Sequence, residues 1–463
     1  MKKTLIIISL ALIMMACDSK LDIVPLGKST LNTVNDLECL LNQPYMIYGG
    51  ATDLETLANN TYPSKWKSVS QMVKQKNSIS YAILACDESV RRDDLTPEDT
   101  RYDAIYEMIN YMNVIISKAP EASGDDTARR RIIAEAHILR AWYHFLAVNI
   151  YAAQYDASNA SSLGGVPYVA TTNVQEQKTK RSIAEVYENI LMDCSDEYIA
   201  DMYQKAVDNP FRGGAELGNG VRALVLLQMK RYDEALAYAQ KALTFNDNIE
   251  DRSQVTVKGM WELDYTSPNN YLLIRGDNSN LGDYYGLVLT PDAASRIEQG
   301  DYLMALDSEH GWDNDIAYGT DGSIMCTASN VHYCVYGIRT ENIIYAAAEA
   351  LIRTGKIKDG LGMIDRVREK RIRNCEAFAQ RQDITTEAQA MALLKDAKRI
   401  EMLTTCYNFF DCKRWNSEPA YAETIVHDLG EDGRHNLTPE SSLWIFPFPQ
   451  NCRLFNPSLT NNY

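Results

Sequence analysis

The stretch GNGVRALVLLQMKRYDEALAYAQKAL, residues 218–243, carries the strongest structural signal in the chain. Its small residues Ala235, Ala239 and Ala242 are spaced by four and then three positions, and Tyr232 precedes them. Small side chains at this helical spacing allow two helices to approach closely, while an aromatic residue fills the space at the turn. The stretch therefore predicts two helices that pack against each other as a pair.

A second copy of this pattern occurs in AAAEALIRTGKIKDGLGMIDRVREK, residues 346–370. Gly355 stands at the expected turn, and Gly360, Ile364 and Val367 take the offsets of the three alanines. Both copies resemble the tetratricopeptide pattern. The copies lie about 125 residues apart, far beyond the roughly 34-residue period of tandem repeats. We therefore expect helix pairs separated by long insertions rather than a simple solenoid.

Two further helices are predicted ahead of these copies. Apolar residues in DAIYEMINYMNVIISKAP, residues 103–120, recur at spacings of three and four, which is the spacing of one helix face. Pro120 ends this helix, and Asp125 begins a longer one that runs to Ala152. The short connection between them predicts an antiparallel hairpin.

The composition is that of an ordinary globular protein with an acidic balance. Of the 463 residues, 46% are hydrophobic and 23% charged, so the chain can form a full core and is not disordered. The formal net charge is −16 and no basic block occurs, which excludes nucleic-acid binding and electrostatic adhesion to an anionic bilayer. The 28 Tyr against 9 Phe indicate amphipathic contact surface.

The N-terminus has the features of a targeting segment. Met1-Lys2-Lys3 precedes an apolar run, residues 5–15, that is too short to span a bilayer. Ala16-Cys17 follows directly and resembles the lipobox of bacterial lipoproteins. This resemblance implies that residues 1–16 are removed and that Cys17 receives a diacylglycerol; the alternative is an ordinary signal peptide with a chance cysteine. Without Lys2 and Lys3 the chain has 44 basic and 62 acidic residues, a net charge of −18.

No motif in the sequence indicates catalysis. Gly218-Asn219-Gly220 with Ala223 imitates a dinucleotide fingerprint, but no hydrophobic strand precedes it, so we interpret it as a loop entering a helix. The patterns C-x-x-C, H-E-x-x-H and G-x-S-x-G do not occur. We therefore predict a protein that is not an enzyme and has neither a cofactor nor a metal site.

Two alternatives stay open for residues 313–334. Asp313-Asn314-Asp315 and Asp321-Gly322 have the oxygen density of a calcium loop, but Ile324 stands where an EF-hand needs a bidentate acid. Cys326 and Cys334 are near enough in the sequence to form a disulfide.

The segment between the two repeat copies, residues 246–336, differs in amino-acid composition from the predicted helices. It is rich in Gly, Asn, Asp, Ser and Tyr, with candidate strands at 271–274 and 285–289. We interpret it as a loop-rich lobe with a little sheet, packed on the helical layer. In many proteins the functional residues lie on such loops, which a rigid scaffold holds in position.

Aromatic side chains cluster in this lobe and include Tyr271. Sugar rings lie on the flat faces of Trp and Tyr, while amides and acids bind the hydroxyl groups. The cluster therefore predicts a carbohydrate surface, although any single aromatic residue is more often part of a core. The predicted ligand-binding residues are Trp66, Trp261, Tyr265, Tyr284, Tyr285 and Trp312.

Several segments, in chain order, resemble the SusD/RagB family of outer-membrane lipoproteins from Bacteroidetes. They are a first helix near 33–41, IIAEAHILRAWYHFLAVNIYA (132–152), the turn Gly164-Gly165-Val166-Pro167, AEALIRTGK (348–356), KRIEMLTTCYNFFDCKRWN (398–416) and LWIFPFPQNCRLFNPSLTNNY (443–463). In the last two, the matching residues are Arg399, Glu401, Asp411, Arg414, Trp415, Pro447, Pro449, Asn456, Pro457, Leu459 and Asn461. Together these segments cover the whole chain.

The resemblance implies a mostly α fold of tetratricopeptide-like helix pairs with a loop-rich ligand-binding lobe that carries a little β structure. We expect a signal peptide at 1–16 and a single mature domain at 17–463. Its expected parts are a helix-pair scaffold at about 100–245 and 337–415, the loop-rich insertion at about 246–336 and an extended C-terminal segment at 416–463.

The resemblance also implies a function. Family members are anchored in the outer membrane by an N-terminal lipid and cap a SusC-like TonB-dependent transporter, into which they deliver a bound glycan. We therefore expect a surface-exposed lipoprotein that captures oligosaccharide or polysaccharide. The alternatives are peptide capture as in RagB, a structural role in bridging the transporter, and a surface glycosidase, which needs two acids about 5–10 Å apart across a cleft.

Overall fold

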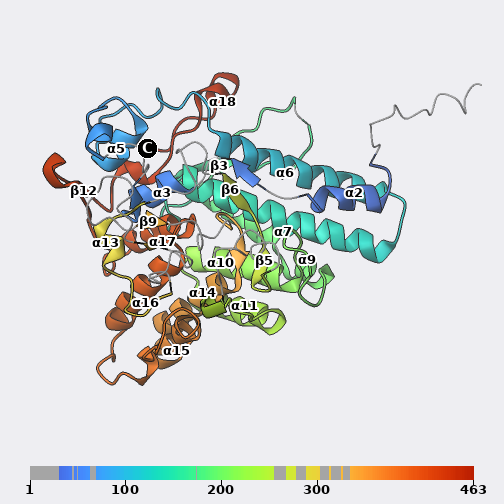
Figure 1. Cartoon of the computed structure of the whole chain (residues 1–463). Coiled ribbons are helices and arrows are strands. Elements are labelled where there is room, and N and C mark those ends of the chain that lie inside the picture. The colour runs from blue at the N-terminus through green and yellow to red at the C-terminus, as the bar shows by residue number, and fades with distance from the viewer. Residues whose placement is uncertain are drawn as a thin grey trace, which may run out of the picture.

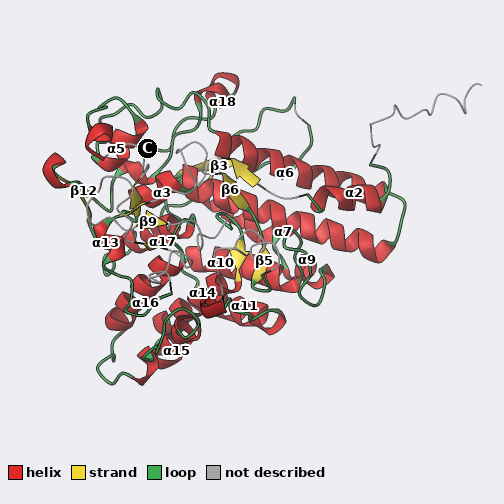
Figure 2. Cartoon of the chain, viewed as in Figure 1, coloured by secondary structure: helices red, strands yellow, loops and turns green. Residues whose placement is uncertain are grey.

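The structure is a computed structural model that describes residues 31–43, 46–48, 51–62, 69–173, 175–254, 267–277, 288–302, 312–313, 325–326 and 334–463. Helices dominate it and the strands are short (Figures 1 and 2), which confirms the predicted fold class. The longer helices are α2 (Val34–Leu41), α6 (Thr100–Lys118), α7 (Asp126–Tyr151), α8 (Ile183–Asp193), α10 (Ala215–Gln228), α11 (Tyr232–Phe245), α14 (Thr340–Arg353), α15 (Ile357–Arg368), α16 (Glu387–Glu401) and α17 (Tyr407–Asn416). The shorter ones are α3 (Thr52–Leu57), α4 (Val69–Val73), α5 (Ile79–Leu84), α9 (Asp196–Asp201), α13 (Pro291–Ala294) and α18 (Gln450–Phe455).

Helices α6 and α7 form the first hairpin and lie side by side (Figure 1). The Asp99 carboxylate accepts the backbone N–H groups of Arg101 and Tyr102 and so caps α6, and Asp125 caps α7 as the sequence predicts. The apolar face of α6 is fully buried at Ile105, Ile109, Met112 and Ile115. None of the helices in the described part of the chain is both long and apolar enough to cross a membrane.

The two repeat copies form the pairs α10–α11 and α14–α15, and α11 packs on α14 so that the pairs stack. The small residues Ala235, Ala239 and Ala242 are fully buried, as their spacing predicts. Gly218-Asn219-Gly220 lies inside α10, so its interpretation as a loop was wrong. An ideal Cβ on Gly220 would lie 3.2 Å from side-chain atoms of both Ile343 and Tyr271, so this glycine serves close packing rather than a turn.

Glycine is required at two positions where α14 meets α15. Gly355 has a φ of +82°, in the left-handed region that favours glycine, and ends the turn as predicted. An ideal Cβ on Gly360 would lie 2.6 Å from Ile352 Cγ1 and 2.8 Å from the carbonyl oxygen of Ala348. The backbone of α15 therefore touches α14 directly, and the small residue in the repeat pattern is a packing requirement.

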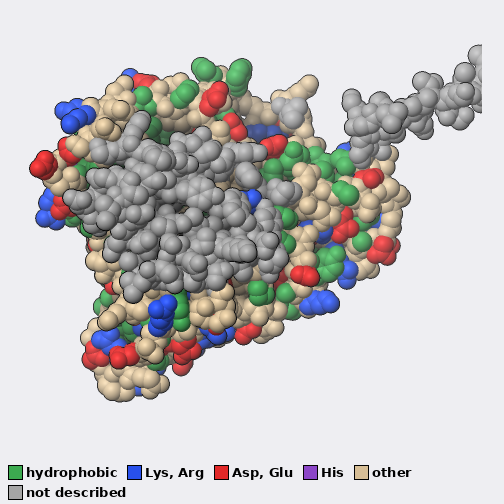
Figure 3. Space-filling view, viewed as in Figure 1, with side chains coloured by type: hydrophobic (Ala, Val, Ile, Leu, Met, Phe, Trp, Pro, Cys, Tyr) green, Lys and Arg blue, Asp and Glu red, His purple; other side chains and the backbone are tan. Residues whose placement is uncertain are grey.

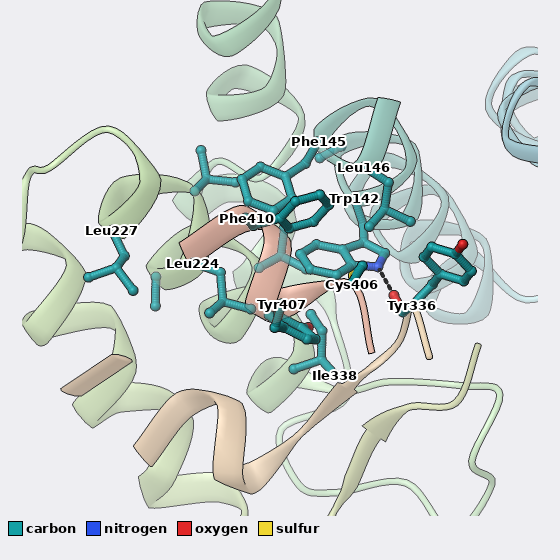
Figure 4. Close-up of a cluster of buried hydrophobic side chains, with 14 of the residues drawn as sticks. Trp142, Phe145, Leu146, Leu224, Leu227, Tyr336, Ile338, Cys406, Tyr407 and Phe410 are labelled. Atoms are coloured by element: carbon teal, nitrogen blue, oxygen red, sulfur yellow. Dashed lines mark hydrogen bonds between the residues drawn. The ribbon is translucent and has the colours of Figure 1, made fainter. Parts of the chain in front are cut away.

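Large side chains close the core where α7 meets α17 (Figure 4). The indole N–H of Trp142 donates to the carbonyl oxygen of Tyr336 at 2.8 Å. The Trp142 ring stacks with Phe145 and Tyr407 at centroid distances of 5.1 and 6.4 Å, and Phe410 meets Phe145 edge-on at 6.0 Å. The first hairpin, the late helix and the chain entering α14 are therefore joined in one core.

Motif residues of α14, α16 and α17 form buried ion pairs. The Arg414 guanidinium donates to both carboxylate oxygens of Glu349, at 2.5 and 2.8 Å, and Trp415 donates to the same carboxylate at 2.9 Å. Arg371 donates to both oxygens of Glu401, at 2.8 and 3.0 Å. Burial disfavours ionisation of Glu349, but Arg414 outweighs it and lowers its pKa to about 2. The charged residues of the motifs therefore hold the helices together.

The C-terminal segment contains more structure than an extended chain. It includes the antiparallel hairpin of β11 (Ile425–Asp428) and β12 (Arg434–Leu437) as well as α18. Near the end of the chain, Asn462 donates to the carbonyl oxygen of Gly165 at 2.8 Å. The segment Gly164–Pro167, predicted as a turn, is the strand β3, which pairs with β4 (Lys180–Ser182). The division into residues 1–16 and 17–463 stays a prediction.

Candidate functional site

A four-stranded sheet joins distant parts of the chain. Its strands are β2 (Thr61–Tyr62), β7 (Val288–Leu289), β9 (Met325–Cys326) and β8 (Trp312–Asp313), which follow one another in this order and pair antiparallel throughout. Two smaller pairs join β5 (Asn270–Leu272) to β10 (Ile338–Arg339) and β6 (Arg275–Asp277) to β1 (Met46–Tyr48). The insertion is thereby attached to the N-terminal part of the chain.

One of the predicted ligand-binding residues belongs to this sheet, and three others lie close in the sequence to its strands. Trp312 is the first residue of β8, and its register partner is Cys326. The described residues that flank the segments of Trp66 and of Tyr284-Tyr285 are Tyr62 and Val288, and these two are register partners. The remaining predicted positions, which lie outside the described residues, are Cys17, Trp66, Trp261, Tyr265, Tyr284 and Tyr285. Their roles, and the contact of Trp312 with a ligand, stay predictions.

One aromatic residue of the sequence cluster is a core residue. Tyr271 is fully buried, and its hydroxyl donates to the carbonyl oxygen of Asn246 at 2.5 Å. Its membership of a ligand surface was therefore wrong. The physical reason is that β5 packs against α10, where Gly220 leaves room for the Tyr271 ring.

The structure does not test the candidate calcium loop or the candidate disulfide between Cys326 and Cys334. Asp313 belongs to β8, whereas the other oxygen donors of the candidate loop and the side chain of Cys326 lie outside the described residues. The Sγ atom of buried Cys334 lies 3.3 Å from the carbonyl oxygen of Leu272. Within the described ranges, no three His, Cys, Asp or Glu side chains are grouped so that they would hold a metal ion.

A polar cavity of about 500 Å³ opens at the base of the sheet. Asn59 comes just before β2, and Pro291 and Asp292 come just after β7, so both strands lead into its wall. Helices α16 and α17 and the β11–β12 hairpin form the rest. The lining residues are Ala58, Asn59, Pro291, Asp292, Arg296, Lys395, Asp396, Arg399, Asn408, Cys412, Trp415, Glu423, Thr424, Ile425, Val426, Asp428 and Arg434.

Arg399 of α16 holds two of these segments in place. Its guanidinium donates to the Asp292 carboxylate at 2.7 Å, to the Asn59 carbonyl oxygen at 2.8 Å, and to the side-chain oxygen of Asn60. The backbone N–H of Thr290 donates to the Asn60 carbonyl oxygen at 2.9 Å. Helix α16 therefore fixes the strand β2 relative to the chain leaving β7.

Every cationic side chain of this lining has a carboxylate partner in the same lining. The pairs are Arg296–Asp396, Arg296–Asp292 at 3.1 Å, Arg399–Asp292 at 2.7 Å, Lys395–Glu423 at 2.7 Å and Arg434–Asp428 at 3.4 Å. Among the described residues, four cations and four carboxylates line the cavity, so their formal charges sum to zero. The cavity is thus a dense array of hydrogen-bond donors and acceptors without net charge.

Two carboxylates at or behind the wall have pKa values that are shifted in opposite directions. Burial disfavours ionisation of Asp292, but Arg399 and Arg296 outweigh it, so the pKa of Asp292 lies below its usual range. Glu55, which accepts from the side chain of Asn60 at 3.2 Å, is 1% exposed, and this burial raises its pKa to about 7. Glu55 does not line the cavity. The perturbed acid is therefore a structural group behind the wall.

A second cavity of about 430 Å³ lies between α3, α5, the start of α6 and the C-terminal segment. Its floor is apolar and includes Ile83, Leu443 and Phe446. The buried Arg101 guanidinium at its edge is held by Asp53 through two bonds, at 2.9 and 3.0 Å. The cavity below the sheet is the better candidate by its position, because β2 and β7, two strands of the sheet that contains Trp312, lead into it.

Sequence reasoning missed the cavity below the sheet. Arg399 is among the residues that carry the family resemblance, and this was the available signal for it. Trp415 is a second such residue, and Asn408 and Cys412 lie in the same motif segment. The other lining residues come from separate segments that have no local pattern of their own, so only the folded chain places them together.

Residues 21–211 match the model of a SusD-like family, whose description reads "Starch-binding associating with outer membrane". Among the curated proteins, none matches the sequence of this chain.

Solved structures extend the likeness to nearly the whole chain. A SusD superfamily protein from Bacteroides thetaiotaomicron VPI-5482 has a TM-score of 0.66 and 16% identity, covering 93% of this chain and 100% of that one. A SusD-like carbohydrate-binding protein from Bacteroides vulgatus ATCC 8482 has a TM-score of 0.66 and 15% identity, covering 92% and 97%. A SusD superfamily protein from Bacteroides fragilis reaches 0.66 at 15% identity, covering 93% and 100%. At these identities the likeness establishes a shared fold.

Proposed function

Because this chain is SusD-like, by its family match at residues 21–211 and by its fold over nearly all its length, we propose that it binds oligosaccharide or polysaccharide at the outer membrane. The proposed binding face is the β2-β7-β9-β8 sheet together with the polar cavity at its base. The observation that carries the proposal is the position of Trp312 in the same sheet whose strands lead into that cavity.

The chemistry of this face suits a sugar. A sugar presents apolar C–H faces, which stack on aromatic rings, and hydroxyl groups that both donate and accept hydrogen bonds. The cavity supplies guanidinium, ammonium, amide and carboxylate groups in close alternation. A volume of about 500 Å³ lies within the range of ordinary ligand pockets.

The proposal does not include bond cleavage. SusD-like proteins bind carbohydrate rather than break it. A glycosidase needs a carboxylic acid that keeps its proton near neutral pH, whereas the pKa of Asp292 is lowered. Glu55, whose pKa is raised, does not line the cavity. Asp292 therefore serves as an ionised hydrogen-bond acceptor.

The proposed cellular role is delivery of the glycan to a SusC-like TonB-dependent transporter. Attachment of lipid at Cys17 would hold the mature chain on the outer membrane, next to that partner. This step rests on the resemblance of the sequence to the SusD/RagB family. The alternative is capture of peptides for the same type of transporter.

Affinity electrophoresis of the mature chain, residues 18–463, tests the binding function. Native gels would contain starch, levan, xylan, mannan, mucin glycans or host glycosaminoglycans. We expect one polymer to retard the protein, and Trp312→Ala to weaken this binding by at least about tenfold, as for a central aromatic contact. Phe455→Ala is the matched control, because Phe455 is 88% exposed on α18, away from the sheet.

The outcomes separate the hypotheses. Circular dichroism of Trp312→Ala checks that the variant is folded. Retardation that Trp312→Ala leaves unchanged would keep the function and reject the site. No retardation by any polymer, together with a shift of intrinsic Trp fluorescence on adding peptides, would favour peptide capture instead.

A further inference from the structure

The charges of the polar cavity are balanced locally as well as in sum. Arg296 lies between Asp292 and Asp396, and the Arg399 guanidinium is occupied by Asp292 and by carbonyl and amide oxygens. Lys395 pairs with Glu423. No cationic group among the described residues of this lining is without a carboxylate partner.

From this arrangement we propose that the site selects uncharged glycans and rejects glycans that carry uronate or sulfate groups. The inference rests on the proposed glycan-binding function and adds the chemical class of the ligand. An anionic group needs a cation that it can pair with, and here each cation is already paired. Binding the anion would require it to displace a protein carboxylate or to lie beside one.

The cost of that approach is electrostatic. A uronate entering the cavity would come near Asp292, Asp396, Glu423 and Asp428, and like charges at contact distance repel. Specificity commonly arises in this way, through a group that opposes the wrong ligand. The mature chain also has a net charge of −18, so its long-range field slows the approach of a polyanion, most strongly at low ionic strength.

A neutral sugar meets no such opposition. Its hydroxyl group accepts a hydrogen bond from a guanidinium and donates one to a carboxylate at the same time. It can therefore bridge both members of a pair such as Arg296–Asp396 without changing the charge balance. In the coloured, described part of the face in Figure 3, basic and acidic side chains are likewise interspersed, and this part shows no large field of positive charge.

The decisive comparison uses one polymer in two charge states. A neutral polysaccharide with free C6 hydroxyl groups that retards the protein, such as starch, is oxidised at C6, which converts its primary alcohols to uronates on the same backbone. If the ligand is levan or xylan, whose chains lack free C6 alcohols, carboxymethylation of hydroxyl groups introduces the charge instead. We expect the oxidised polymer to bind the mature chain about tenfold more weakly at low ionic strength, with the difference shrinking as salt is added. Starch, levan, polygalacturonate, alginate and chondroitin sulfate serve as the initial panel.

A charge variant tests whether the cavity is responsible. Asp396→Asn leaves the cavity with one excess positive charge, because Arg296 loses a partner. We expect it to recover a several-fold gain in affinity for the oxidised polymer and to change binding of the neutral polymer little. The matched control is Asp383→Asn, which removes an exposed carboxylate paired with Arg381 at 2.7 Å outside the cavity.

The results distinguish the inference from the function on which it rests. Strong binding of an acidic polymer by the unaltered protein overturns the inference and leaves glycan binding intact. Equal gains from Asp396→Asn and Asp383→Asn also overturn it, because the effect would then reflect net charge alone. Failure of every polymer, neutral or acidic, rejects the proposed function itself.

Discussion

Glu349 and Arg414 come from two motifs that lie 65 positions apart in the chain. Both side chains are fully buried, and Asp411 shares the Arg414 guanidinium at 2.8 Å. A buried charge is tolerated only when it is paired and hydrogen-bonded. The charged residues of the motifs therefore form contacts between helices. Arg399 likewise joins separate segments at the wall of the cavity.

Replacing Glu349 by Gln should destabilise the protein by about 3–5 kcal/mol at neutral pH, because Arg414 would lose its bidentate buried partner and would keep only the single contact with Asp411. The folded-state pKa of Glu349 lies near 2, below its ordinary value of 4.5. Its stabilisation is therefore fully present above pH 4.5 and is lost as the pH falls toward 2. Urea unfolding of both proteins at several pH values would show the gap between them narrowing in this window.

Glu234→Gln is the control for this measurement. Glu234 pairs with Arg231 on the surface of α11, where the two side chains are 50% and 40% exposed. Exposed pairs contribute about 0–1 kcal/mol, so this variant should remain close to the parent. An equal loss in both variants would show that burial of the Glu349–Arg414 pair has no special weight.

At the scale of elements, the contact between α14 and α15 depends on the absence of a side chain. The Cβ atom of an alanine at position 360 would lie within 2.8 Å of the Ala348 carbonyl oxygen, and backbone does not yield as a flexible side chain does. Gly362 lies in the same helix with no atom within 4 Å of its ideal Cβ. Replacing these two glycines of the same helix by alanine should therefore change the stability of the protein in opposite directions.

We expect Gly360→Ala to lower the free energy of unfolding by about 1–3 kcal/mol through overpacking. Gly362→Ala should instead raise it by as much as about 1 kcal/mol, since alanine is the better helix former. Thermal and urea unfolding of the two variants side by side would measure the difference. If both variants gained stability, the close approach of α15 to α14 would not exist in solution.

At the scale of the whole molecule, local patterns were sufficient for the helices and insufficient for the cavity. Spacings of three and four predicted the faces of α6 and α11, and Asp125 and Gly355 marked a helix start and a turn, because these features depend on neighbours in the chain. The prediction of a loop at Gly218–Gly220 was wrong because the residue that requires a small side chain there, Tyr271, lies far along the sequence.

The cavity could not be predicted for a related reason. Its wall is made of residues from near β2, after β7, from α16 and α17 and from the β11–β12 hairpin. The contacts that join these segments are distant in sequence: Arg399 lies 107 positions from Asp292 and 340 from Asn59. No periodicity links such residues. The composition of residues 246–336 was sufficient to predict a loop-rich lobe. Composition does not show which side chains of different segments lie together in the folded chain.

The attachment of the whole molecule to the membrane is predicted to depend on one atom, the Sγ of Cys17. Cys17→Ala should abolish labelling by a fatty-acid precursor and move the protein from the detergent phase to the aqueous phase, because no helix in the described part of the chain is long and apolar enough to span a bilayer. Cys39→Ala is the matched control, since Cys39 is an exposed free thiol on α2. If the unaltered chain carries no lipid, or if Cys39→Ala releases it equally, Ala16-Cys17 belongs to an ordinary signal peptide. Glycan binding by residues 18–463 would survive that result, whereas delivery to a neighbouring transporter would need another means of holding the two proteins together.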